Sequence, residues 1–338
     1  MSQIKFTNLA ICIFLLFIII CFSIFAGGCD FNFENSSGSG KLNIITTNFP
    51  LYDFARQICG YGESNDNETI VPNVMLLLPP GVESHTYEPS PRDIIRIQEC
   101  DLFIYVGGDS DAWVDRILSN MDKPVRSIKL IDYIDAVEEE LSEGMEAESE
   151  HEHEHNHEVD DKIDYDPHIW TSPKNAVKMI KAIQEEICRL DASNTDFYKS
   201  NADKYNGEIQ RLDFEFTEFF KTIKNKCLIF GDRFPFRYFA EAYNLKYYAA
   251  FPGCSTQSEP GSATIAFLID KVKSEKISTV FYIEFSNHGI ADSIAAAANV
   301  KTALLHSCHN ISSDDIDNNV TYLSLMEQNL KTLKGAMK

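Results

Sequence analysis

Basic side chains are scarce in this 338-residue chain. Lysine and arginine number 30 against 51 aspartate and glutamate residues, a formal net charge of −21. Proteins that bind nucleic acid or dock on anionic lipid by charge need the opposite balance, so the composition argues against both classes. The acidity is local: residues 138–166 hold fourteen acids and one lysine, and outside them 37 acids face 29 bases. Most of the chain is therefore a mildly acidic globule.

The cysteines have no Cys-x-x-Cys spacing. That absence excludes a zinc ribbon and a thioredoxin-type motif. Three of the nine fall in the first 29 residues, and the other six could pair as disulfides outside the cytoplasm, with the pairing left open by the sequence. These six are Cys59, Cys100, Cys188, Cys227, Cys254 and Cys308.

The N-terminal segment has the pattern of an export signal. Residues 9–26 form an almost continuous apolar run, long enough for a transmembrane helix or a long signal sequence. Small residues precede Cys29 and a Gly- and Ser-rich tract follows it, which resembles the lipobox of bacterial lipoproteins. We predict a signal peptide over 1–28, lipidation at Cys29 and a flexible tether over 29–41, with an uncleaved anchor as the alternative.

From residue 42 onward, short apolar runs alternate with segments of helical period. Strands are predicted at 42–47, 74–78, 101–106 and 126–131, and again at 227–230, 247–251, 278–283 and 302–305. Helices are predicted at 51–59, 90–98, 237–243, 263–273, 290–297 and 322–336. This alternation indicates parallel α/β units, in which ligands bind at the carboxyl ends of strands. We predict an α/β fold of two lobes, each with about four parallel strands, and a site in the cleft between them.

Two further helices are predicted between the lobes. Ser172-Pro173 is a good helix start, with serine as N-cap and proline at the first helical position. In 195–222, apolar residues recur at spacings of three and four, and Gly207 is the only obstacle. Twenty-eight helical residues span about 42 Å, enough to bridge two lobes. The predicted domains are an N-terminal lobe at 42–170 with an acidic loop at 138–166, a helical connection at 172–222 and a C-terminal lobe at 226–338.

Four histidines alternate with acids inside the acidic loop. The first five residues of this tract satisfy the zinc-protease pattern H-E-x-x-H, which works only on a stable helix. Like charges at i,i+4 oppose a helix here. We interpret the tract as a loop that captures transition metals weakly, with a solvated run of charge as the alternative. The four histidines are His151, His153, His155 and His157.

Two isolated histidines stand at the ends of predicted elements. His85 follows the second strand, and His168 lies just before the helix that starts at Ser172. Either one by itself is more often a structural histidine than a metal ligand. Beside a His-rich loop, the two together point to a metal site.

Several motifs, in this order, resemble the metal-binding lipoproteins that feed bacterial zinc and manganese ABC importers, in their zinc-uptake branch. The similarity covers about 43–337. Its motifs are NFPLYDFA at 48–55, PPGVESHTYEPSP at 79–91, DLFIY at 101–105, DPHIW at 166–170 and TYLSLM at 321–326. The resemblance implies two (β/α) lobes joined by one long rigid helix, which agrees with 195–222. It also implies that His85 and His168 are the metal ligands of the first lobe.

The second lobe departs from that family. Members place a His or Glu ligand where this chain has Arg233, and arginine cannot ligate a cation because it has no lone pair to offer. Asp232 could shift in as a replacement. The family's last ligand, an Asp, falls near Cys308, whose thiolate with two imidazoles would favour Zn²⁺ over Mn²⁺. A buried thiol or a disulfide is the alternative for the cysteines. The further candidates at strand ends are His306, His309 and Cys254.

The resemblance implies an extracytoplasmic solute-binding protein, lipid-anchored to the bacterial cell membrane and monomeric. It would capture Zn²⁺ between its lobes and deliver it to the permease of an ABC importer, with no catalytic role. The nearest alternative is a receptor of the same type for Mn²⁺ or Fe²⁺. An extracellular zinc-dependent hydrolase would need three protein ligands, an open water position and a base such as Glu83 or Glu284, and neither glutamate stands in a recognisable motif. A surface adhesin with a structural metal is a further alternative.

Overall fold

The computed structural model describes residues 41–61, 71–83, 87–108, 111–145, 165–255 and 259–337. The predicted signal peptide, Cys29 and the tether up to residue 40 lie outside this part of the chain, as do His85 and the four histidines of 151–157. None of the helices within the described ranges is both long and apolar enough to cross a membrane. The six cysteines beyond the N-terminal segment are all described, and each is a free thiol.

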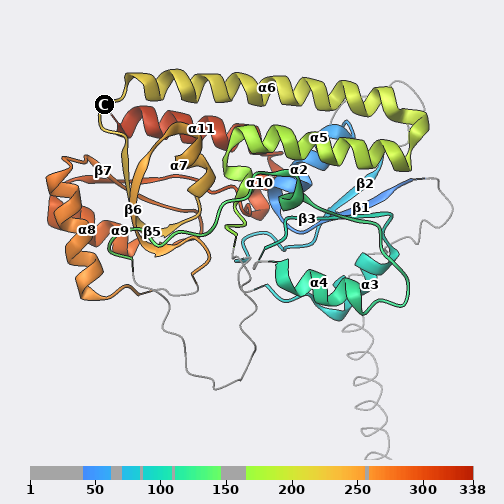
Figure 1. The fold of residues 1–338 in the computed structure, drawn as a ribbon, viewed down its shortest axis with the longest axis horizontal. Helices are drawn as coiled ribbons and strands as arrows, with labels where there is room; N and C mark the ends of the chain where they lie inside the picture. The colour runs from blue at the N-terminus through green and yellow to red at the C-terminus, as the bar shows by residue number, and fades with distance from the viewer. Residues whose placement is uncertain are drawn as a thin grey trace, which may run out of the picture. The chain divides into compact units, whose positions relative to one another are not determined.

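The first sheet consists of four parallel strands in the order β2-β1-β3-β4 (Figure 1). Its central strands are buried on both faces, as is typical of parallel strands covered by helices. Ile44 packs in the core on the side of α2, and its neighbour Ile45 packs on the side of α3 and α4. The elements are β1 (Asn43–Thr46), α2 (Phe49–Ile58), β2 (Asn73–Leu76), α3 (Pro91–Glu99), β3 (Leu102–Tyr105), α4 (Ala112–Ser119) and β4 (Ser127–Lys129).

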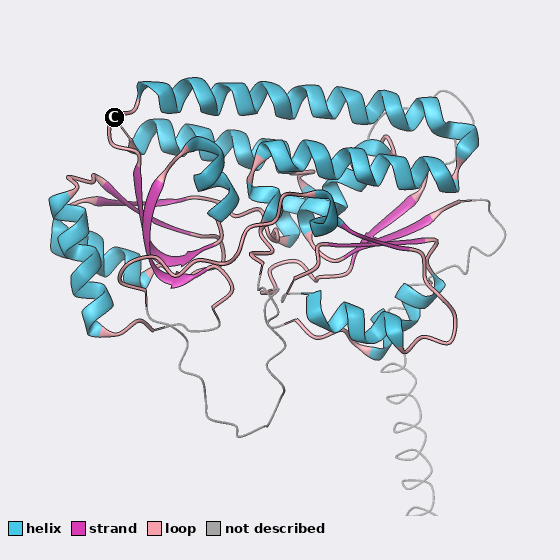
Figure 2. Cartoon of the chain, in the orientation of Figure 1, coloured by secondary structure: helices cyan, strands magenta, loops and turns pink. Residues whose placement is uncertain are grey.

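The second sheet repeats this plan with the order β6-β5-β7-β8, again all parallel (Figure 2). Helix α9 lies directly against β5. This close approach needs glycine at position 231, because a Cβ atom there would come within 2.3 Å of the Ala291 Cα. The register of β5 against β6 shifts between Phe230 and Arg233, at the end of the strand that faces the site. The elements are β5 (Cys227–Phe234), α7 (Arg237–Tyr243), β6 (Lys246–Pro252), α8 (Ser262–Ser274), β7 (Thr279–Tyr282), α9 (Gly289–Ala298), β8 (Lys301–Leu304) and α10 (Ser313–Asp317).

A layer of long helices joins the two lobes: α5 (Pro173–Leu190), α6 (Thr195–Thr222) and α11 (Tyr322–Ala336). Figure 1 shows α6 running along both lobes. In the first lobe, the Tyr205 hydroxyl of α6 donates a hydrogen bond to the buried Asp53 carboxylate of α2 at 2.6 Å. In the second lobe, the Tyr243 hydroxyl of α7 donates to Asp213 of α6 at 2.8 Å. The single helix therefore bridges the lobes, as its length predicted.

The predicted fold class is confirmed, and the exceptions are local. Helices α6, α7 and α11 have the predicted bounds. Strand β4 is shorter than predicted, because the chain turns into a 3₁₀ helix at Leu130–Tyr133. Ser172 occupies the N-cap position, but its side chain makes no capping hydrogen bond, and the first turn is closed by the Ala176 N–H donating to the Ser172 carbonyl.

The segment 137–145 leaves the first sheet and contacts the second lobe. Glu140 pairs with Arg237 at 3.2 Å, and Glu143 pairs with Lys271 at 3.0 Å. The Thr264 hydroxyl donates a hydrogen bond to the Gly144 carbonyl. The first residues of the predicted acidic loop therefore contact the second lobe.

Replacing Gly207 with alanine is expected to stabilise the protein by about 1 kcal/mol, because glycine is the poorer helix former. A Cβ atom added at this exposed position of α6 meets no atom within 4 Å. Thermal unfolding should show a midpoint raised by about 2 °C. Gly231→Ala is the control and should be destabilised by the clash with α9. An unchanged or lower midpoint for Gly207→Ala would show that α6 does not gain from helix propensity at this point.

Candidate metal centre

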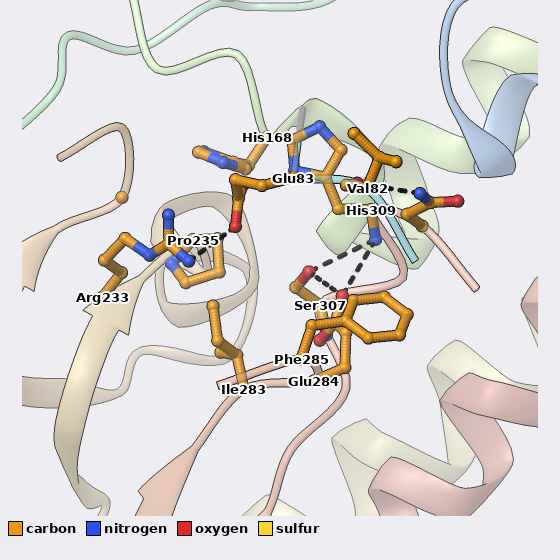
Figure 3. A pocket seen from close by; sticks show the side chains of 12 residues that line it. Val82, Glu83, His168, Arg233, Pro235, Ile283, Glu284, Phe285, Ser307 and His309 are labelled. Atoms are coloured by element: carbon orange, nitrogen blue, oxygen red, sulfur yellow. Dashed lines mark hydrogen bonds and ion pairs between the residues drawn. The ribbon is translucent and has the colours of Figure 1, made fainter. Parts of the chain in front are cut away.

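A small cavity lies between the lobes, where the chain leaves strands β5, β7 and β8. Its volume is about 20 Å³, enough for about one water molecule or ion. The first lobe lines one side of it and the ends of the second-lobe strands line the other (Figure 3). The polar side chains that line it are Glu83, His168, Arg233, Glu284, Ser307, His309 and Asn310.

His168 enters this cavity from the DPHIW segment. Its ring is fully buried, and its Nδ1 lies 2.9 Å from Asp166 Oδ1, which also accepts the His168 backbone N–H. A carboxylate on one ring nitrogen is the arrangement that orients a histidine to ligate through the other nitrogen, here Nε2. A Cβ atom on Gly253 would stand 3.0 Å from the His168 Cε1, so glycine allows the second lobe to approach the ring closely.

His309 meets His168 from the opposite lobe. The two ring centroids are 5.6 Å apart and the rings are nearly perpendicular. Two imidazoles on one tetrahedral zinc ion, with Zn–N of about 2.1 Å, would have centroids about 5 Å apart. Trp170 holds the two segments together, because its Nε1 donates to the Ser307 carbonyl at 2.8 Å. The pair is therefore close to the separation that a shared zinc ion requires.

Glu284 organises the loop that carries His309. Its carboxylate accepts the backbone N–H and the hydroxyl of Ser307, at 2.7 and 2.5 Å, and the His309 N–H at 3.3 Å. It also lies 3.6 Å from His306 Nδ1. This carboxylate therefore supports the loop that carries His309.

The remaining second-lobe candidates do not line this cavity. The Cys308 side chain is fully buried, and burial raises its pKa well above the usual thiol range, which disfavours a thiolate ligand. The Asp232 carboxylate accepts two backbone N–H groups, from Arg233 and Ile283. His306 accepts the Cys308 N–H on its Nδ1, and the Cys254 N–H donates to Glu139.

The cavity holds one pair of opposite charges. Arg233 Nη2 donates to Glu83 Oε2 at 2.7 Å, joining β5 of the second lobe to the segment that follows β2 in the first. From its sequence position, Glu83 was expected only as a base in the hydrolase alternative. A partly buried arginine usually pairs with a carboxylate, and Glu83 is close to the predicted ligand His85 in the sequence.

In the described ranges, no three His, Cys, Asp or Glu side chains are grouped closely enough to hold a metal ion. His85 lies outside those ranges. The structure therefore brings together His168 and one of the further candidates, His309, and it leaves the predicted pairing of His85 with His168 untested.

Two parallel α/β lobes, one bridging helix and a small polar cavity between strand ends define the class of two-lobed solute-binding proteins. The sequence model of one family, "Zinc-uptake complex component A periplasmic" (ZnuA), matches residues 44–336. The chain belongs to this family. The resemblance inferred from the sequence motifs is thereby confirmed.

Individual relatives agree with this membership. The chain is 32% identical over 305 residues to the zinc-binding lipoprotein AdcA of Streptococcus pneumoniae, covering 89% of this chain and 57% of AdcA, so it spans little more than half of that relative. It is 32% identical over 323 residues to the high-affinity zinc uptake system protein ZnuA of Bacillus subtilis, covering 94% and 95%. The Zn(II)-bound ZnuA-like domain of S. pneumoniae AdcA aligns with a TM-score of 0.68 and 30% identity, over 88% of this chain and 98% of that domain.

Proposed function

We propose that this protein captures Zn²⁺ in the cavity between its lobes and delivers it to the permease of an ABC importer. The observation that carries the proposal is the pair of imidazoles, His168 and His309, that face each other from opposite lobes at 5.6 Å. The names of the relatives, which are zinc-binding and zinc-uptake proteins, support zinc as the cargo.

We assign His168, His309 and His85 as the imidazole ligands. His168 is held by Asp166, so that its Nε2 is the ligating atom. His309 is preferred to Cys308 as the second-lobe ligand because its ring lines the cavity, whereas the thiol is fully buried. Imidazole ligands favour Zn²⁺ over Mn²⁺, which prefers oxygen. No catalytic role is proposed, since Glu284 is occupied in holding the 307–309 backbone.

The cellular setting belongs to the same proposal. We infer that residues 1–28 are removed as a signal peptide and that Cys29 carries the lipid anchor on the outer side of the cell membrane. The relative named as a zinc-binding lipoprotein supports this anchoring. The protein would act as a monomer, and the His-rich tract at 151–157 would be an auxiliary, weak metal-capturing loop.

The test is a zinc titration against a chromophoric chelator, with Mn²⁺ as competitor. We expect one tight Zn²⁺ site that a hundredfold excess of Mn²⁺ does not empty. The same titration of a variant lacking 147–160 should lose weak zinc binding and keep the tight site. This deletion is narrow enough to preserve the contacts of Glu140 and Glu143 with the second lobe.

Each arm of this titration has an outcome that contradicts one part of the proposal. Displacement of zinc by Mn²⁺ would reassign the cargo, and absence of tight zinc binding would remove the proposed function. Loss of the tight site in the deletion variant would show that the loop is not auxiliary.

A further inference from the structure

We propose that Glu83 supplies a carboxylate ligand to the captured ion and that Arg233 positions this carboxylate from the opposite lobe. The inference rests on the proposed function, because it concerns the same cavity. It explains how a chain with arginine at a ligand position can still close a metal site between its lobes.

The two side chains line the same cavity as the imidazoles of His168 and His309. Figure 3 shows Glu83 beside the rings of His168 and His309, with its carboxylate turned to Arg233. The Arg233 side chain is 17% exposed and the Glu83 side chain 36% exposed, and both line the cavity. In the described ranges, Glu83 is the hydrogen-bond and ion-pair partner of the Arg233 guanidinium. The pair is thus part of the wall that surrounds the proposed ion.

The backbone on each side of this pair is fixed. The register shift in β5 ends at Arg233, whose N–H donates to the Asp232 carboxylate at 2.8 Å, and Asp232 also accepts the Ile283 N–H from the end of β7. On the other side, the Asn310 side-chain amide donates to the carbonyl groups of Pro79 and Val82. Both charged side chains therefore start from backbone that is tied to the second-lobe loops.

A carboxylate between Arg233 and a bound cation would offset the repulsion between their two positive charges. Arginine stays protonated at all accessible pH values, so an unscreened guanidinium in the cavity would repel Zn²⁺. A carboxylate has two oxygens and can serve both partners. Glu83 Oε2 accepts from Arg233 Nη2, and in the proposed site the same carboxylate would ligate the ion. Ligating carboxylates are commonly held by such a second hydrogen bond.

Ion binding must bring the Glu83 carboxylate closer to the imidazoles, because no three side chains of the described ranges are yet grouped as ligands. The side chain is partly exposed and can rotate, whereas its backbone is anchored beside the His309 loop. The resulting set has imidazole nitrogens and one carboxylate oxygen, an ordinary combination for Zn²⁺.

A purely repulsive role for Arg233 predicts the opposite change in zinc affinity when the arginine is removed. If Arg233 only repels cations, its removal must raise zinc affinity. If it positions Glu83, its removal must lower zinc affinity. Arg233→Met removes the charge with similar length and separates these two cases. Arg237→Met is the matched control, because Arg237 is also partly buried and pairs across the lobes with Glu140 but does not line the cavity.

The experiment measures zinc affinity of the full chain in detergent by chelator competition, and the visible spectrum of the Co²⁺-loaded protein. We expect Glu83→Gln to weaken zinc binding by more than about 10-fold and Arg233→Met by about 10-fold. The variant that combines Glu83→Gln with Arg233→Met should bind zinc no more weakly than Glu83→Gln alone, because Arg233 acts through Glu83. The Co²⁺ spectrum should change in Glu83→Gln and stay unchanged in Arg237→Met. Thermal unfolding of each variant separates misfolding from ligand loss.

Three results would overturn the inference. Tighter zinc binding by Arg233→Met would make Arg233 a repulsive group. An unchanged affinity and Co²⁺ spectrum in Glu83→Gln, with binding lost in His309→Ala, would leave the zinc site standing and remove Glu83 from it. Absence of tight zinc binding by the unmodified chain would instead remove the proposed function together with this inference.

Discussion

Replacing His309 with alanine is expected to lower the zinc affinity by more than about 100-fold. Loss of a group that merely supports a metal ligand costs 10–100-fold, so loss of a ligand must cost more. His168→Ala should have at least as large an effect, because its ring is fully buried and its Nδ1 is held by Asp166. Chelator competition measures both affinities.

Two controls separate ligand loss from other effects. His288 is 49% exposed, pairs with Asp292 and does not line the cavity, so His288→Ala should bind zinc like the unmodified protein. Cys308→Ala tests the thiolate alternative and should leave the affinity within about threefold, since a change of under about 0.7 kcal/mol is the size of an indirect effect. Loss of binding in Cys308→Ala with retention in His309→Ala would reverse the assignment.

Replacing Asp111 with asparagine is expected to stabilise the protein at neutral pH. Asp111 Oδ2 accepts the N–H groups of Val106 and Gly107, at 2.8 and 3.0 Å, where β3 ends. Burial outweighs these two hydrogen bonds and raises the pKa of this carboxyl to about 6. The folded protein therefore holds the proton more tightly than the unfolded chain, whose aspartates have a pKa near 3.9.

The direction in which stability changes with pH follows from this difference between the folded and unfolded pKa values of Asp111. Because the folded pKa is raised, the favourable contribution of Asp111 is present below about pH 4 and is lost as the pH rises to about 6. Above pH 6 the ionised carboxylate costs about 2–3 kcal/mol. Asparagine keeps an acceptor oxygen for the two N–H groups and carries no charge, so the variant should recover most of this loss at pH 7.

Urea unfolding of both proteins between pH 4 and pH 8 measures the effect. The difference in unfolding free energy should be near zero at pH 4, grow up to pH 6 and then stay constant. Asp135→Asn is a control of opposite sign, because Lys178 lowers the pKa of that exposed carboxyl. A difference that does not depend on pH, or a less stable Asp111→Asn protein at pH 7, would contradict the assigned cause.

Local sequence patterns determined most of the fold. Helix α6 could be predicted to the residue, because its apolar positions recur with helical period over 28 residues. The alternation of strands and helices predicted parallel sheets, because a helix between two strands carries the chain back so that both strands run in the same direction. His168 could be proposed as a ligand because it follows Asp166 directly before a helix, and this short-range arrangement is present.

Only the tertiary structure separates His309 from Cys308 as the proposed second-lobe ligand. The two residues are adjacent, so sequence position could not separate them. Cys308 has a left-handed backbone conformation with φ of 63°, and in the resulting turn the thiol lies in the core while the His309 ring lines the cavity. In a loop, side-chain direction depends on each backbone angle, and no period in the sequence records those angles.

The same limit applies to the charged pair in the cavity and to the acidic segment 137–145. Arg233 and Glu83 are 150 positions apart in the chain, and their contact depends on the register shift in β5 and on the approach of one lobe to the other. The sequence by itself determined the elements and the family, and it named His168, which lines the cavity. The second-lobe half required the folded structure, because long-range contacts depend on how the lobes pack and leave no local pattern.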